Sequence, residues 1–128
     1  MKLGYVILFV PDVAATASFY EKAFGLKRRF EPESGQYVEM DTGGTALGFT
    51  SEEFVRKGGL PFAPLDPKGK PPAIEIALIA DDVAAAVAHA VKAGAVVVKQ
   101  PELKPWGQTV AVVRDLNGAL VELCTKMS

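Results

Sequence analysis

The chain carries one pattern twice, and this internal repeat constrains its fold more than any other feature. The segments DVAATA (12–17) and DVAAAV (82–87) each follow an apolar run of strand-like composition. Further along, DTGGTALG (41–48) is matched by DLNGALVE (115–122). Self-similarity at a long period is typical of duplicated structural units, so we expect each half to fold as a copy of the other.

The first copy reads as a strand, a helix and three more strands. The apolar run 5–10 predicts a covered strand, Asp12 is a good N-cap, and Gly25 ends the helix. A hairpin turn at Gly43-Gly44 joins the last two strands. The expected strands after this helix are 26–30, 37–40 and 45–50.

The second copy has the same order of elements. Asp82 caps a helix that ends at Gly94, and Gln100 to Gln108 is expected to be a loop. The expected strands are 74–79, 96–98, 110–113 and 120–124. The sequence therefore predicts the α+β class, with two βαβββ repeats forming a curved mixed sheet, helices outside and a concave cleft inside. One domain, 1–128, would comprise repeat 1 (1–50) and repeat 2 (73–128).

The segment 51–72 between the repeats holds most of the prolines of the chain. Its Gly- and Pro-rich composition predicts no regular element. It would serve as a linker, or as a lid, since Phe54, Leu60 and Phe62 are apolar residues in an otherwise polar stretch.

Composition excludes several classes of function. The formal net charge is −1 and the sequence pI is about 5.8, so nucleic acid and anionic membranes are not expected partners. The apolar runs are too short to span a bilayer, and the start of the chain does not resemble a signal peptide. The single cysteine, Cys124, fits a reducing compartment as a buried apolar side chain. We therefore expect a cytoplasmic protein.

The motifs also resemble those of a known family. The first helix, SFYEKAFGL (18–26), and the ending PWGQ (105–108) with RDLNGALVEL (114–123) are similar to the vicinal oxygen chelate superfamily, over essentially the whole chain. That group includes glyoxalase I, extradiol dioxygenases and bleomycin-resistance proteins. The resemblance implies the fold predicted above and a ligand cleft.

The resemblance also implies where a divalent metal would bind. The enzymes of the family hold it with side chains from the first and last strands of each repeat, commonly His and Glu. Aligning the repeats places these positions at Tyr5, Gly48, Glu75 and Glu122. Glycine offers no side chain, and a neutral tyrosine is a poor ligand, so two carboxylates remain. His89 falls within a helix, outside the cleft. We expect no metal or other cofactor.

A cleft that has lost its ligands suits the binding of a small molecule. Tyr5, Ile7 and Phe9 alternate onto one face, and Trp106 stands in a Pro-flanked loop, where aromatic rings can stack on a planar ligand. Tyr37 and Phe62 are further candidates. Glu75 and Glu122 would contact an amine, pair with Arg or Lys from a partner subunit, or supply a general base. Glu39 and Arg114 are expected to be solvated or paired.

The leading hypothesis is a metal-independent binding protein of the antibiotic-resistance type, which sequesters a planar or amine-bearing ligand. One alternative is a metal-dependent lyase, isomerase or dioxygenase that uses Glu75 and Glu122. Another is an interaction module with a vestigial cleft. A mean hydropathy of +0.19 and the habits of the superfamily favour a homodimer.

Overall fold

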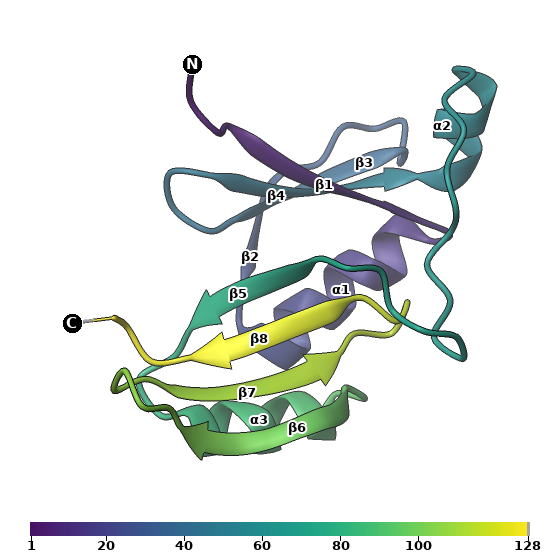
Figure 1. Ribbon diagram of the computed structural model, residues 1–128. Coiled ribbons are helices and arrows are strands. Elements are labelled where there is room, and N and C mark those ends of the chain that lie inside the picture. The colour runs from purple at the N-terminus through teal and green to yellow at the C-terminus, as the bar shows by residue number, and fades with distance from the viewer. Residues whose placement is uncertain (128) are drawn as a thin grey trace. The chain divides into compact units, whose positions relative to one another are not determined.

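The computed structural model describes residues 1–127 and divides them into two compact units. The first unit is Met1–Leu65 and the second begins at Asp66. Each unit contains one repeat (Figure 1). None of the described helices is long and apolar enough to cross a membrane. The elements are β1 (Tyr5–Val10), α1 (Val13–Phe24), β2 (Lys27–Phe30), β3 (Tyr37–Asp41), β4 (Ala46–Ser51), α2 (Glu52–Lys57), β5 (Glu75–Ile79), α3 (Val83–Lys92), β6 (Val96–Leu103), β7 (Thr109–Arg114) and β8 (Leu120–Cys124).

The predicted βαβββ order is confirmed in both units. The strands are hydrogen-bonded as two four-stranded mixed sheets, in the orders β1-β4-β3-β2 and β5-β8-β7-β6. In each sheet the first strand runs parallel to the last, and the other neighbours are antiparallel. The sequence predicted one curved mixed sheet; in the structure the described strands of each repeat pair only with one another, which gives two mixed sheets.

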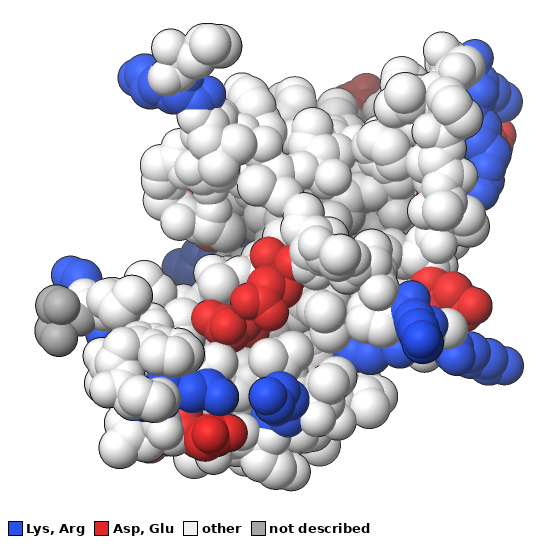
Figure 2. Space-filling view, in the orientation of Figure 1, with Lys and Arg blue, Asp and Glu red and all other residues white. Residues whose placement is uncertain are grey.

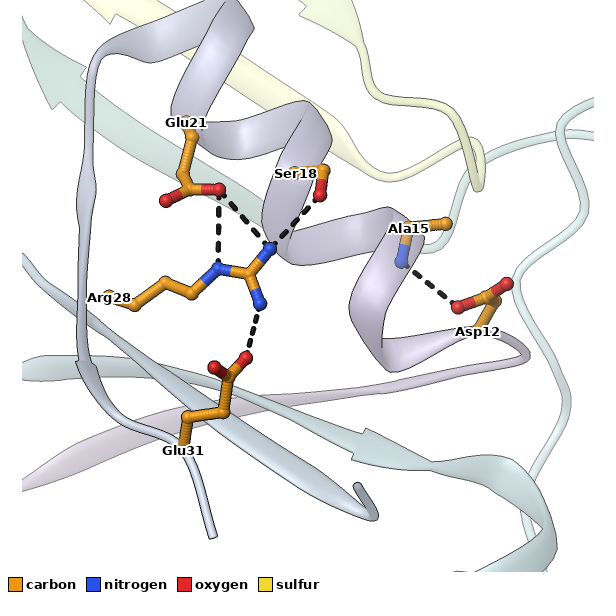
Figure 3. Close-up of polar contacts among 6 residues, drawn as sticks. All are labelled: Asp12, Ala15, Ser18, Glu21, Arg28 and Glu31. Carbon is orange, nitrogen blue, oxygen red and sulfur yellow. Dashed lines mark hydrogen bonds and ion pairs between the residues drawn. The ribbon is translucent and has the colours of Figure 1, made fainter. Parts of the chain in front are cut away.

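The helices α1 and α3 begin where the capping residues predict; α1 ends at the predicted Gly25, and α3 has Ala93 as its C-cap, one residue before the predicted Gly94. Asp12 accepts a hydrogen bond from the Ala15 backbone N–H at 2.9 Å, and Asp82 does the same for Ala85 at 3.0 Å. Gly25 ends α1 in the left-handed conformation, with φ of 69°. The N-cap of α1 is among the contacts drawn in Figure 3.

Each helix covers one face of its own sheet with an apolar core. In the first unit, the ring of Tyr20 on α1 packs at 4.8 Å from that of Phe49 on β4, and both are fully buried. In the second unit, Val87 and Ala90 of α3 are buried, as are Val113 and Val121 of the sheet. Because strand side chains alternate, the remaining residues of each sheet point to the opposite face.

The first strand after α1 is tied to the helix by Arg28. Its guanidinium donates to Glu21 at 3.2 Å and to Ser18 at 3.0 Å, both on α1, and also pairs with Glu31 (Figure 3). The Arg28 side chain is 25% exposed, so solvent weakens these ion pairs.

We expect Arg28→Met to lower the free energy of unfolding by about 0.5–1 kcal/mol, because it removes these bonds and keeps the apolar stem. Urea denaturation would measure the change. Lys27→Met is the matched control, since Lys27 is exposed and forms no ion pair with the described residues. Equal losses in the two variants would contradict the role of Arg28.

The structure corrects the prediction for the segment 51–72. A short helix, α2, occupies Glu52–Lys57 where no regular element was expected. Ser51 caps it by accepting from the Phe54 N–H, and Glu53 pairs with Lys57 at 2.9 Å. A good cap, an acidic first turn and a basic last turn favour a helix locally, and the prolines begin only after it has ended.

The structure also corrects the prediction for the loop 100–108. The strand β6 continues to Leu103, so its last residues are paired with β7. Pro101 is tolerated because β6 is an edge strand and the register shifts between Lys99 and Glu102. The remaining turn is closed by the Lys104 N–H, which donates to the Gln108 carbonyl at 2.7 Å.

Candidate functional site

Strand register gives the two repeats a common frame for their sites. Tyr5 pairs with Ala46 as Glu75 pairs with Leu120, so Tyr5 and Glu75 are equivalent positions. Two residues further along each strand, Ile7 pairs with Gly48 as Ala77 pairs with Glu122, so Gly48 and Glu122 are also equivalent. The four positions aligned from sequence therefore occupy matching places in the two sheets, on the faces opposite α1 and α3.

In the first unit, the position of Gly48 is taken by an aromatic ring. A Cβ atom on Gly48 would lie 2.6 Å from the Tyr37 hydroxyl oxygen and 2.7 Å from its Cε1 atom. Tyr37 therefore lies directly over the glycine, and any larger residue there would displace the ring. Tyr5 and Ile7 of the neighbouring strand are exposed, at 58% and 44%.

Tyr37 belongs to a hydrogen-bonded cluster with two charged residues. Its hydroxyl donates to Glu39 Oε2 at 2.8 Å, while the other oxygen, Oε1, accepts from Arg29 Nε at 2.9 Å and from Nη2. Glu39 is 8% exposed and lies directly opposite Gly48. Of the two alternatives expected for Glu39, solvated or paired, the structure shows the paired one, and its partner is Arg29.

The pKa values of this cluster follow from its contacts. The hydrogen bond from Arg29 holds the pKa of Glu39 below its usual value, and the bond from Tyr37 adds to this effect. Burial, together with the bond to Glu39, raises the pKa of Tyr37 to about 12. At neutral pH the phenol is protonated, its proton is committed to Glu39, and its oxygen can still accept a hydrogen bond.

In the second unit, the equivalent positions hold two carboxyl groups on the same face of two adjacent strands. Figure 2 shows acidic atoms gathered over β5 and β8, whose acidic residues are Glu75 and Glu122. Although Glu75 is exposed as a residue, partial burial of its carboxyl group and a hydrogen bond with Glu122 raise its pKa. Within residues 66–127, neither carboxyl group forms an ion pair with a Lys, Arg or His.

Cys124 lies two residues beyond Glu122, on the same face of β8. It is 5% exposed, and its Sγ atom lies 3.8 Å from the Leu78 carbonyl oxygen. Burial and the neighbouring Glu122 raise the pKa of the thiol, so it stays protonated at neutral pH. The predicted role as a buried apolar side chain is confirmed.

Arg114 is paired, as one of the expected alternatives stated, but with backbone oxygens. Its guanidinium donates to the carbonyls of Gly118 at 2.9 Å, Gly69 at 2.8 Å and Asp66 at 2.9 Å. It therefore fastens the start of the second unit to the turn between β7 and β8.

Trp106 stands on the turn between β6 and β7, with its ring 59% exposed. Its Nε1–H donates to Gln108 Oε1 at 2.8 Å, and Gln108 in turn donates to the Thr125 carbonyl. The turn is thus joined to the end of β8, whereas Glu75 lies opposite Leu120 at its start. Trp106 and Glu75, both predicted to contact the ligand, therefore lie near opposite ends of β8.

Phe62 is held against the first sheet. Its ring meets that of Phe9 edge-on at 5.2 Å, and the Arg56 guanidinium lies 4.8 Å from its ring centroid. The apolar part of the segment 51–72 is therefore partly anchored on β1 and α2.

Two of the functional candidates were missed by sequence reasoning. Arg29 and Phe30 lie on a strand whose alternation is broken, so spacing along the chain does not place them. A usable signal was the pair Tyr37 and Glu39, two residues apart in a predicted strand and therefore on one face. His89 is exposed on α3, as expected. Among residues 1–127, no three His, Cys, Asp or Glu side chains are grouped closely enough to hold a metal ion.

Comparison with known proteins gives the family. The model of the Glyoxalase/Bleomycin resistance protein/Dioxygenase superfamily matches residues 2–123. The chain belongs to this superfamily. The resemblance seen in the motifs is therefore confirmed, as is the α+β fold that it implied. No curated protein matches the chain.

Solved structures share the superfamily fold at low sequence identity. A glyoxalase/bleomycin resistance protein/dioxygenase family enzyme from Burkholderia phytofirmans PsJN is 23% identical, with a TM-score of 0.83 and 98% of each chain covered. A glyoxalase-related enzyme from Fulvimarina pelagi is 19% identical, with a TM-score of 0.81, covering 98% of this chain and 88% of the other. TioX from Micromonospora sp. ML1 is 24% identical, with a TM-score of 0.73 and 98% of each covered. These similarities establish the fold.

Proposed function

We propose that this member of the superfamily is a metal-independent binding protein that sequesters a planar, amine-bearing small molecule. The observation that carries the proposal is the Glu75–Glu122 pair, in which two carboxyl groups lie on the same face of adjacent strands without a cationic partner in their unit. Two neighbouring carboxylates repel, and a bound ammonium group relieves that repulsion with charge-assisted hydrogen bonds.

The residues of the first unit support a site without metal. At the positions that the superfamily's enzymes use for ligation, Gly48 offers no donor atom and the overlying Tyr37 fills the space of a side chain. Tyr5 offers a phenol, a poor ligand for zinc or manganese. The nearby Glu39 is held by three hydrogen bonds, so binding a metal would require breaking them.

An exposed aromatic ring would supply the planar contact. Trp106 of the second unit is more than half exposed, and an aromatic ring stacked on a planar ligand adds about 0.5–1.5 kcal/mol beyond burial. In this proposal the protein acts in the cytoplasm as a homodimer, and protection against an antibiotic is its physiological role.

Removing one carboxylate tests the amine contact. We expect Glu122→Gln to weaken binding of protonated 9-aminoacridine by about tenfold or more, because a charged hydrogen bond contributes about 1.5–3 kcal/mol. Isothermal titration calorimetry would measure the affinity, with acridine, uncharged at pH 7.5, as the control ligand. Affinity of the unmodified protein should rise with pH as Glu75, whose pKa is raised, becomes ionised.

Glu102→Gln is the matched control variant, because Glu102 is an exposed acid of the same unit that already pairs with Lys104. Equal binding of 9-aminoacridine by the Glu122→Gln and Glu102→Gln variants would refute the proposal. Stoichiometric metal that is lost, together with a catalytic activity, in Glu122→Gln would favour the metal-dependent lyase, isomerase or dioxygenase instead.

A further inference from the structure

Two adjacent arginines of β2 point to opposite faces of the first sheet. Arg28 contacts Ser18 and Glu21 of α1, whereas Arg29 contacts Glu39 on the face opposite α1. Simple alternation would send Phe30 back to the helix side. Instead, its ring lies 6.3 Å from that of Tyr37, on the same face as Arg29.

A β-bulge explains this arrangement. The pairing register shifts between Arg28, opposite Met40, and Phe30, opposite Glu39, so Arg29 and Phe30 together face one residue of β3. A bulge of this kind breaks the alternation and re-aims side chains, and bulges are frequent beside functional sites. It brings a cation and an aromatic ring to one side of the strand.

Arg29 retains hydrogen-bonding capacity in this position. Its Nε and Nη2 atoms both donate to one oxygen of Glu39, which leaves the edge formed by Nη1 and the outer side of Nη2. Among residues 1–127, Nη1 has no hydrogen-bond partner, and the side chain is 40% exposed. The planar fork of that edge matches the two oxygens of a carboxylate.

Three aromatic side chains lie on this face of the sheet, and two of them are exposed. Phe30 is 55% exposed and Tyr5 is 58% exposed, while Tyr37 is fixed between Gly48 and Glu39. Tyr5 on β1 lies on the same face, because its partner Ala46 is two residues from Gly48 on β4. Fixed rings bind planar groups at a low entropic cost.

We propose that Arg29, Phe30, Tyr37 and Tyr5 form a binding site for a planar aromatic ring that bears a carboxylate. Phe30 and Tyr5 contact the ring, and the outer edge of Arg29 binds the carboxylate. Glu39 holds Arg29 in place and is a positioning residue. This site goes beyond the amine-binding function proposed above, because it lies in the other unit and selects the opposite charge.

The test uses 2-naphthoate as the ligand, titrated calorimetrically, with the uncharged 2-naphthamide as the control. We expect Arg29→Lys to weaken naphthoate binding by about tenfold, because lysine keeps the charge and loses the fork. Phe30→Ala should weaken both ligands, since it removes the ring contact. Arg28→Lys, on the opposite face, and Phe54→Ala, with a phenylalanine 52% exposed, are the matched controls and should leave binding unchanged.

Glu122→Gln separates this proposal from the previous one, because it should leave naphthoate binding intact. Three results would overturn the carboxylate site. The first is no binding of 2-naphthoate by the unmodified protein, and the second is that the Arg29→Lys variant binds it as tightly as the unmodified protein. The third is that Arg29→Lys and Arg28→Lys weaken naphthoate binding equally. Thermal unfolding of every variant verifies that it is folded. If Arg29→Lys does not fold, unchanged naphthoate binding by the folded Phe30→Ala variant overturns the proposal.

Discussion

Replacing Gly118 with alanine should lower the free energy of unfolding by about 3 kcal/mol or more, as measured by urea denaturation. Two costs combine. Gly118 has φ of 93°, where a side chain is strained by about 1–2 kcal/mol. A Cβ atom would also lie 2.7 Å from the Pro67 Cα atom and 2.8 Å from the Asp66 carbonyl oxygen, and such overpacking costs about 1–3 kcal/mol.

Gly107→Ala is the control that separates these costs. Gly107 also has a positive φ, 101°, but its added Cβ would meet no atom within 4 Å. It should therefore show the backbone strain alone. The difference between the two variants then reports the close approach of the segment that Arg114 fastens to the turn. Equal destabilisation in both would mean that this approach is absent in solution.

Gly48→Ala should cost about 2 kcal/mol for a different reason. The backbone of Gly48 does not have a positive φ, so the cost comes from the clash with the Tyr37 ring. The ring must move, which breaks its hydrogen bond to Glu39. The pKa of Tyr37, raised to about 12 by burial and this bond, should then fall toward the ordinary value, as an ultraviolet titration would record.

A double-mutant cycle with Tyr37→Ala tests whether the two residues are coupled. With the ring removed, Gly48→Ala should be nearly neutral, giving a coupling energy of about 2 kcal/mol. Gly44→Ala is the matched control, because its Cβ meets no atom within 4 Å and its φ is not positive. An unchanged cost of Gly48→Ala in the Tyr37→Ala background would contradict the contact.

Local chemistry made the repeated elements predictable. Asp12 and Asp82 carry their capping function in the residue itself, and Gly25 can adopt the left-handed conformation that ends a helix. A capping serine and charged end turns also favour α2, but the prolines that follow it predict an irregular segment. Pro101 misled similarly, since only the sheet order shows that its strand lies at an edge.

The residues of the candidate site were predictable only where the two repeats of the sequence could be aligned with each other. This alignment located Tyr5, Gly48, Glu75 and Glu122, and strand register confirms that these positions are equivalent. The cluster around Glu39 depends instead on a register shift in β2, which no periodicity reveals. Tertiary pairing also decides that Tyr37 fills the space above a glycine, because the two residues lie on different strands.

The bulge of β2 has a counterpart in the second unit, where the register of β6 shifts between Val97 and Lys99. Val112 lies opposite Glu122 there, as Glu39 lies opposite Gly48. The same irregularity of the backbone thus occurs in both repeats. The side chains on it differ: they are aromatic and charge-neutralised in the first unit, and acidic and aliphatic in the second. Two repeats with one backbone geometry can therefore carry different side chains at equivalent positions, and a substitution in one unit need not alter the fold of the other.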